Sequence, residues 1–262
     1  MRGGRTLTHR REREYDLPSP DLLSLQAERL ASMRNRIFRR LGIAALGPVL
    51  DLGTGYGAVV PELVRRSRGP VLALDRSPKS FKNPEVFNGA LPVRGDGTAL
   101  PFPDELFALV HVQLVFMWQT FAAPLAGEIA RVLRPGGSLL AVEPDYGGLV
   151  EWPNSIAART LWESALERAG ADPRVGRKLP SLFESLGLRT RIDLPNVSSA
   201  PDPDRFDLLQ TLPLSNPEQK LLAECRKRDN ALKAEEKFVH LPVFFISATK
   251  PVHPQKNARR GH

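Results

Sequence analysis

Short apolar runs that end in an acidic residue recur along the first half of the chain. Residues 48–51, 71–75 and 91–96 are three such runs, and each closes on an aspartate. Apolar runs of this length predict buried strands of a parallel sheet. Because the carboxyl ends of parallel strands lie at one edge of a sheet, the sequence predicts that the three carboxylates share that edge.

Further apolar patterns predict the remaining elements. Residues 106–112 and 138–143 predict the fourth and fifth strands. Helical spacing over residues 21–40 predicts a helix ahead of the first strand, capped by Asp21. Pro84 is expected to interrupt the helix that follows the second strand. The other predicted elements are helices at residues 124–133, 155–169, 179–186 and 217–237, the last capped by Asn216, and strands at residues 188–194 and 243–249.

Three glycines at alternate positions follow the first strand, within residues 51–57 (DLGTGYG). Glycine lets the backbone turn sharply and approach a ligand before a helix opens near Val59. The segment also fits the dinucleotide fingerprint G-x-G-x-x-G/A. The aspartates at the strand ends would repel a pyrophosphate but attract a cationic nucleoside. The charge pattern therefore favours a sulfonium nucleoside over a dinucleotide.

Three motifs narrow the assignment: residues 51–57 (DLGTGYG), 95–102 (GDGTALPF) and 128–137 (EIARVLRPGG). In their order and spacing the chain resembles class I S-adenosylmethionine-dependent methyltransferases, close to the small-molecule branch around the quinone-biosynthesis enzymes. The resemblance covers about residues 40–150. It implies an α/β, Rossmann-like, seven-stranded mixed sheet of order 3-2-1-4-5-7-6 with helices on both faces, an N-terminal helix and a helical insertion before the last strand.

The resemblance also implies S-adenosyl-L-methionine as the cofactor, bound at the carboxyl ends of the strands. Asp75 would bridge the ribose hydroxyls, and Asp96 would accept a hydrogen bond from the adenine amino group. Asp51 and the glycine turn would hold the methionyl amine and carboxylate, and Gln26 or Arg34 could also reach that carboxylate. The full predicted binding set is Asp51, Gly53, Thr54, Gly55, Gly57, Asp75, Arg76, Asp96, Gly97 and Gln113.

Methyl transfer from a sulfonium is an in-line displacement, so the protein mainly aligns the partners and excludes water. An amine or phenolate acceptor needs no base, whereas a neutral hydroxyl or a carbon acid does. Glu143, Asp145 and His240 are the candidate bases, with a strand-end cap, a turn residue and a surface group as their structural alternatives. His111 is expected to be a core histidine. Candidates for the pocket wall, or for core packing, are Phe116, Met117, Trp118, Tyr146 and Trp152.

The charge of the chain is concentrated at its ends. Of the formal net charge of +8, residues 1–14 carry +3 and residues 250–262 carry +4, which leaves +1 between them. The sequence predicts two basic disordered tails at these ends and one methyltransferase domain over residues 15–249. Within it, a cofactor-binding core covers about residues 40–150 and a substrate lid about residues 200–240.

The expected partner is a small-molecule methyl acceptor. A lone Cys225 and five scattered histidines predict no metal site. A polar start and the lack of a long apolar run predict a cytoplasmic protein without a membrane span. Two alternatives stay open: an RNA or protein methyltransferase guided by the basic tails, and a non-catalytic module that binds S-adenosylmethionine. The absence of an Asn-Pro-Pro-Tyr motif after the fourth strand makes a nucleic-acid acceptor the less favoured of these.

Overall fold

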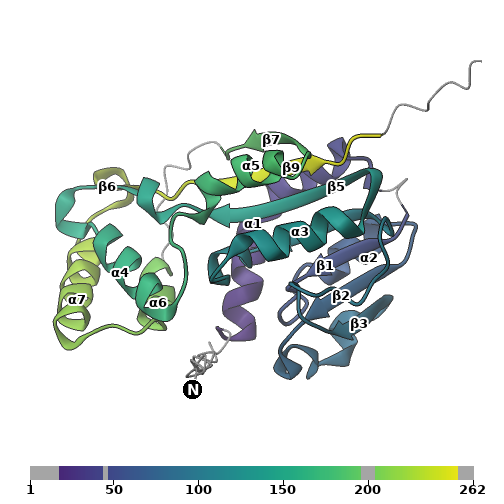
Figure 1. Cartoon of the computed structure of the whole chain (residues 1–262). Coiled ribbons are helices and arrows are strands. Elements are labelled where there is room, and N and C mark those ends of the chain that lie inside the picture. Colours follow the sequence, from purple (N-terminus) through teal and green to yellow (C-terminus); the bar gives the residue numbers. More distant parts are fainter. Residues whose placement is uncertain (1–17, 44–46, 196–203, 253–262) are drawn as a thin grey trace, which may run out of the picture.

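The computed structural model describes residues 18–43, 47–195 and 204–252. A mixed sheet with helices on both faces forms its centre (Figure 1). The strand order is β3 (Ala90–Arg94), β2 (Val71–Asp75), β1 (Val49–Leu52), β4 (Phe107–Gln113), β5 (Leu133–Pro144), β9 (Val243–Thr249) and β7 (Arg189–Asp193). The strands from β3 to β5 are parallel, and β9 runs antiparallel between β5 and β7. Since β7 and β9 are the sixth and seventh strands of this sheet in chain order, the predicted topology is confirmed.

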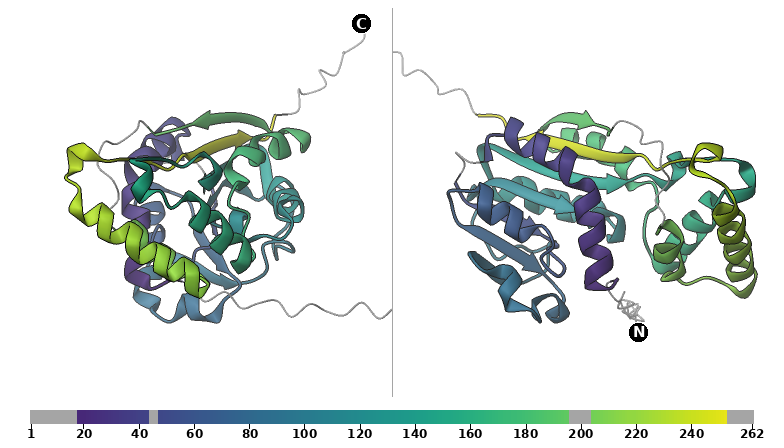
Figure 2. Two further views of the ribbon diagram at one scale, coloured as in Figure 1. Left: turned by 90° about the vertical axis from the view of Figure 1, so that its left-hand side faces the viewer. Right: turned by 180° about the vertical axis from the view of Figure 1, so that it is seen from behind.

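Helices cover the two faces of the sheet in separate layers (Figures 1 and 2). The face covered by α1 (Pro20–Arg40) and α2 (Val60–Arg66) buries Phe38 and Leu63. The opposite face, under α3 (Ala122–Val132) and α5 (Val175–Ser185), buries Phe116 and Phe183, whose ring centroids lie 5.5 Å apart. Burial of each such side chain contributes about 1.5–3 kcal/mol, so the sheet is anchored on both sides.

Two predicted helix caps are wrong by one or two residues. α1 begins after Ser19, whose Oγ accepts a hydrogen bond from the Leu22 N–H at 3.3 Å. Asp21 lies inside the first turn, where its charge complements the helix dipole. α7 (Asn216–Ala231) is capped by Ser215, because Glu218 at the third helical position accepts from the Ser215 N–H at 2.7 Å and completes a capping box.

The segment between β2 and β3 contains no α-helix. It forms two single 3₁₀ turns, η2 (Pro78–Phe81) and η3 (Pro84–Phe87), each with a proline in its first turn. The expected interruption at Pro84 is therefore confirmed. The other short turns are η4 (Phe116–Trp118), η5 (Tyr146–Gly148), η6 (Asn154–Ile156) and η7 (Ala234–Glu236).

A separate lobe lies beyond the carboxyl end of β5, at the left of Figure 1. It contains α4 (Arg159–Ala169), α6 (Arg205–Gln210), α7 and a small sheet of β6 (Val150–Trp152) with β8 (Phe238–His240). The buried Arg205 guanidinium joins these elements, since its nitrogens lie 2.5 Å from Glu151 Oε1 and 3.0 Å from Asp229 Oδ1. The predicted insertion thus folds together with residues 150–169, and its first residues, 200–203, lie outside the described ranges.

The predicted tails fall mostly on residues that the structure does not describe: all of residues 1–14, and 253–262 at the other end. Lys250, assigned to the second tail, belongs to the domain, because its Nζ donates to the carbonyls of Ala130 at 3.0 Å and Leu133 at 2.8 Å. Within the described ranges, no helix has the length and apolar character needed to cross a membrane.

Candidate active site

A cavity of about 1060 Å³ opens at the carboxyl ends of the parallel strands. Its walls come from the glycine turn after β1, the ends of β2 and β3, the residues after β4, the start of α1, and the lobe. The topology brings these segments together because all the parallel strands end at this edge. The predicted cofactor-binding residues that line the cavity are Asp51, Gly53, Thr54, Gly55, Asp75, Arg76, Asp96, Gly97 and Gln113.

The glycine turn has the left-handed backbone that its sequence predicts. Gly53 and Gly55 have φ values of +73° and +52°. A Cβ on Gly53 would lie 2.3 Å from Val115 Cγ2, so this glycine is needed for the turn to pack against the segment after β4. Gly57 differs, because it is not part of the cavity wall and its Cβ would meet Val86 Cγ1 at 2.8 Å. In the structure this glycine allows close packing on η3, and its role at the cofactor site stays a prediction.

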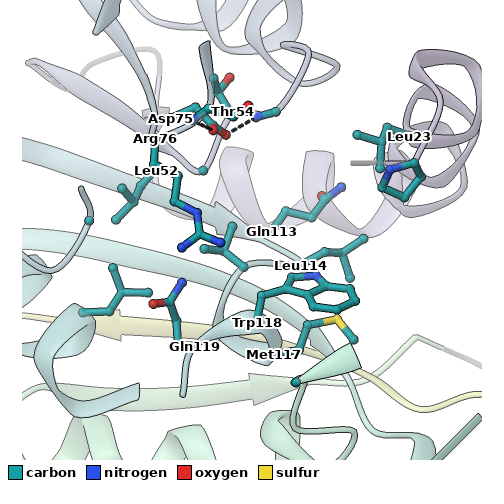
Figure 3. Close-up of a pocket in the computed structure, with 18 of the residues that line it drawn as sticks. Leu23, Leu52, Thr54, Asp75, Arg76, Gln113, Leu114, Met117, Trp118 and Gln119 are labelled. Carbon is teal, nitrogen blue, oxygen red and sulfur yellow. Dashed lines mark hydrogen bonds between the residues drawn. The ribbon is translucent and has the colours of Figure 1, made fainter. Parts of the chain in front are cut away.

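Asp75 lies at the end of β2 and is fixed by two backbone amides (Figure 3). Its Oδ2 accepts from the Gly55 N–H at 2.9 Å, and its Oδ1 accepts from the Ser77 N–H at 2.8 Å. A carboxylate has about four acceptor positions, so acceptor capacity remains at this cavity-lining group. The side chain is thus both a brace for the glycine turn and a group that can accept hydrogen bonds from a diol.

Asp51 has protein partners on both of its oxygens. Oδ2 accepts from Thr54 Oγ1 at 2.6 Å, and Oδ1 lies 2.7 Å from His111 Nδ1. His111 is buried, as expected of a core histidine, and yet it lines the cavity and its Nε2 has no partner among the described residues. Sequence reasoning missed this pairing, which follows from the direct register of Asp51 with His111 across β1 and β4.

The end of β3 supplies a more open wall. Asp96 is exposed, and its Oδ1 accepts from both the N–H and the Oγ1 of Thr98 at 2.8 Å. A Cβ on Gly97 would lie 2.8 Å from Leu125 Cδ1, so the chain passes α3 too closely for a side chain. Asp51, Asp75 and Asp96 together are called the acidic wall below. In Figure 3 the Arg76 side chain extends from this wall toward Gln119.

Gln113 is oriented by a buried arginine of α1. Arg34 donates to Gln113 Oε1 at 3.0 Å and pairs with Glu62 Oε2 at 2.6 Å. Because Oε1 is engaged, the amide NH₂ of Gln113 is left as the donor of this cavity-lining side chain. Arg34 is not part of the wall, so of the two helix residues considered for the methionyl carboxylate only Gln26 lines the cavity.

None of the three candidate bases lines the cavity. Glu143 is fully buried, and its Oε1 accepts from the amides of Val115 at 2.8 Å and Phe116 at 2.7 Å. Burial raises the pKa of this carboxyl to about 8, while the three backbone N–H donors at Val115 to Met117 lower it. Glu143 therefore caps η4, which is the structural alternative that the sequence offered.

The other two candidates are also structural. Asp145 is buried, and its Oδ2 lies 2.6 Å from Arg177 Nε. His240 lies on β8, paired with Val150 in the small sheet of the lobe. All three thus lie outside the cavity wall, and a role as a base stays a prediction for each of them. A strand-end position alone does not determine whether a side chain turns toward the cavity or toward the packing helices.

The lobe and the segment after β4 form an apolar and aromatic wall. Tyr146 and Trp162 stack with ring centroids 4.7 Å apart. Phe116 packs in the core instead, and Trp152 is 64% exposed outside the cavity. Sequence reasoning missed Trp162 and the α6 residues, because no local pattern shows how the lobe docks. The wall is made by Leu114, Met117, Trp118, Phe121, Tyr146, Trp162, Leu166, Leu208 and Leu212.

Known families and proteins match this chain. A family model described as a methyltransferase domain matches residues 50–141. Demethylmenaquinone methyltransferase of Mycolicibacterium paratuberculosis is 31% identical over 173 residues, which are 64% of this chain and 68% of that protein. Malonyl-[acyl-carrier protein] O-methyltransferase 1 of Coxiella burnetii is 34% identical over 119 residues, 44% of this chain and 41% of that protein. The chain spans less than half the length of this relative and of two others.

Solved structures share the fold. Geranyl diphosphate C-methyltransferase from Streptomyces coelicolor, solved with S-adenosyl-L-homocysteine, has a TM-score of 0.53 at 15% identity, covering 85% of this chain and 80% of that one. The YcgJ protein of Bacillus subtilis has a TM-score of 0.58 at 15% identity, covering 84% and 99%. At such identities the likeness shows the fold alone. With the family model and the relatives above, it leads to one conclusion: the chain belongs to the class I S-adenosylmethionine-dependent methyltransferases, enzymes that take S-adenosyl-L-methionine as cofactor.

Proposed function

We propose that this enzyme transfers a methyl group to a small-molecule acceptor inside the cavity at the carboxyl ends of the strands. One observation carries the proposal: Asp51, Asp75 and Asp96 line a single cavity around the Gly53–Gly55 bend. S-adenosyl-L-methionine, when bound, supplies an electrophilic methyl group on a sulfonium centre. The residues of this chain would then bind its three parts and keep water away from the transfer.

The hydrogen-bond acceptors of the acidic wall fit such a cofactor. Asp75 would accept hydrogen bonds from the ribose diol, using the oxygen capacity that Gly55 and Ser77 leave. The exposed Asp96 would accept from the adenine amino group. The amide of Gln113 would donate to the methionyl carboxylate. Asp51 would act mainly by fixing that turn through Thr54.

A small acceptor is supported by the size and enclosure of the cavity. Pockets for drug-sized ligands usually measure about 300–1,000 Å³, so a cavity of about 1060 Å³ has room for a cofactor and a second molecule of modest size. Leu208 and Leu212 of the lobe also line it. Among the relatives, demethylmenaquinone methyltransferase is named for a small molecule as its substrate.

Calorimetry with the purified chain tests the proposal. Titration with S-adenosyl-L-methionine and S-adenosyl-L-homocysteine should each give saturable binding at one site. Labelled S-adenosyl-L-methionine should then transfer its methyl group to one or more members of a panel of small phenols, amines and carboxylic acids. Folded protein that shows no saturable binding at millimolar ligand would disprove the proposal. Binding with methyl transfer only to RNA or protein would remove the small-molecule acceptor.

A further inference from the structure

The two sides of the cavity differ sharply in chemistry. The cofactor side has the three aspartates, whereas the lobe side is apolar and aromatic. In Figure 3, Met117 and Trp118 lie across the cavity from Asp75. The cavity therefore has a polar compartment, suited to the cofactor, and a second compartment that is apolar and aromatic. The members of the second compartment, called the lobe wall below, are Met117, Trp118, Tyr146, Trp162, Leu208 and Leu212.

The lobe wall offers flat surfaces. The Tyr146 and Trp162 rings stack at an interplanar angle of 28°, and both side chains are buried. Trp118, on η4 after β4, adds a third aromatic side chain to the lining of the cavity. Aromatic faces at this spacing favour a planar ligand, because offset stacking adds to the gain from apolar burial.

Charged groups on this side lie at its margin. Glu167 and Arg168 line the cavity from α4, and both are exposed. Arg168 is also paired with Glu218 of α7, at 2.9 Å. A charged acceptor would lose its hydration in the lobe wall without gaining a buried counter-ion there. The compartment therefore selects an acceptor with an uncharged body.

The lobe wall also limits the methylated atom. The lobe wall itself contains no carboxylate or imidazole, and Glu143, Asp145 and His240 do not line the cavity; His111 lines it beside Asp51, on the cofactor side. A carbon acid would need such a base. A phenolic hydroxyl, which is much more acidic than a carbon acid, can instead pass its proton to a water molecule during the transfer, so that no unpaired phenolate is buried in the lobe wall. Its oxygen lone pair then forms the bond to the methyl carbon, and the electron pair of the broken carbon–sulfur bond goes to sulfur.

We infer that the acceptor is a planar, apolar aromatic molecule bearing a hydroxyl or amino group, seated against the aromatic side chains of the lobe wall, and methylated on that oxygen or nitrogen. This inference depends on the proposed function, since it names the substrate class of the same site. The lobe supplies the specificity, while the acidic wall holds the cofactor. The geometry distinguishes this acceptor from amino acids, sugars and other polar small molecules.

A matched pair of probes tests the inference. 2-Naphthol and its saturated analogue decahydro-2-naphthol share a carbon skeleton and a hydroxyl, but only the first is planar. Calorimetry in the presence of saturating S-adenosyl-L-homocysteine should give at least tenfold tighter binding of 2-naphthol, and turnover should yield the O-methyl ether. Equal affinity, methylation on carbon, or preferred turnover of polar amines such as glycine would overturn the inference.

Variants of the lobe wall separate this test from the fate of the cofactor site. Leu208→Glu and Trp162→Leu should each weaken 2-naphthol binding at least tenfold and leave S-adenosyl-L-homocysteine affinity within about twofold. Leu221→Glu is the matched control, because Leu221 is 43% exposed on α7 and is not part of the cavity. Normal cofactor binding with unchanged 2-naphthol binding in both wall variants would refute the inference alone. If the wild-type protein does not bind S-adenosyl-L-homocysteine, the proposed function is refuted as well.

Discussion

Asp75 and Gly55 are joined by a hydrogen bond of 2.9 Å from the Gly55 amide to the Asp75 carboxylate. This bond couples the end of β2 to the bend after β1, twenty residues earlier in the chain. The same carboxylate also accepts from Ser77, so its position is fixed before any ligand arrives. Preorganisation of this kind lowers the entropy that binding must offset.

Asp75→Asn tests this carboxylate directly. The substitution keeps the size of the side chain but removes its charge and one of its two acceptor oxygens. Loss of a hydrogen bond to a charged group costs about 1.5–3 kcal/mol, which corresponds to roughly tenfold to hundredfold weaker binding. Calorimetry with S-adenosyl-L-homocysteine measures it. Asp104→Asn is the control, since Asp104 is exposed and pairs with Arg131 outside the cavity, and equal losses in both variants would contradict the assignment.

Gly53→Ala should destabilise the fold through two separable effects. Its φ of +73° disfavours a side chain, and the added methyl would clash with Val115 Cγ2 at 2.3 Å. Gly187→Ala isolates the first effect, because Gly187 has a φ of +79° with open space around it. Urea unfolding should show a cost of about 1–2 kcal/mol for Gly187→Ala, from the left-handed backbone alone, and a clearly larger one for Gly53→Ala. Val115→Ala should recover part of the difference, and no recovery would argue against the clash.

Glu143 should make stability depend on pH. Burial raises the pKa of its carboxyl to about 8 in the folded protein, against 4.5 for a glutamate in water. The folded state thus binds the proton more tightly, so this stabilising effect is complete below about pH 4.5 and is lost as the pH rises toward 8. Urea unfolding between pH 5 and 8 should show this decline in the wild type and a flatter profile in Glu143→Gln. Glu224→Gln, on an exposed side chain, should keep the wild-type slope.

Arg205 is expected to hold the lobe together. Arg205→Met would leave Glu151 and Asp229 as buried carboxylates without their shared cation, although Lys237 still contacts Asp229. Breaking a buried ion pair in this way costs about 3–5 kcal/mol. We expect lower stability and a larger loss of methyl transfer than of S-adenosyl-L-homocysteine binding. Arg228→Met, which removes an exposed pair with Glu224 at 3.4 Å, should change neither quantity appreciably.

The parallel part of the sheet was predictable from the sequence because each strand coincides with a local apolar run whose end is visible in the sequence. β2 matches its predicted range completely, as does β9. The acidic wall followed from topology, since strands that run parallel must end together. Local patterns were sufficient wherever the structure is determined by neighbours in the chain.

The acceptor side was not predictable in the same way. Trp162 and Leu208 reach the cavity only because the lobe is fixed by pairs such as Arg205 with Glu151, 54 residues apart. The burial of Glu143 under η4 was not predictable either, because it depends on how the chain turns after β4. Side-chain direction at strand ends and the docking of separate elements are tertiary properties, which single-residue spacing does not encode.

A crystal structure with S-adenosyl-L-homocysteine bound would show where the cofactor lies. We expect ribose hydroxyls within hydrogen-bond distance of Asp75, adenine beside Asp96 and Gly97, and the sulfur facing the lobe wall. A ligand bound elsewhere, or a ribose held without Asp75, would contradict this binding mode.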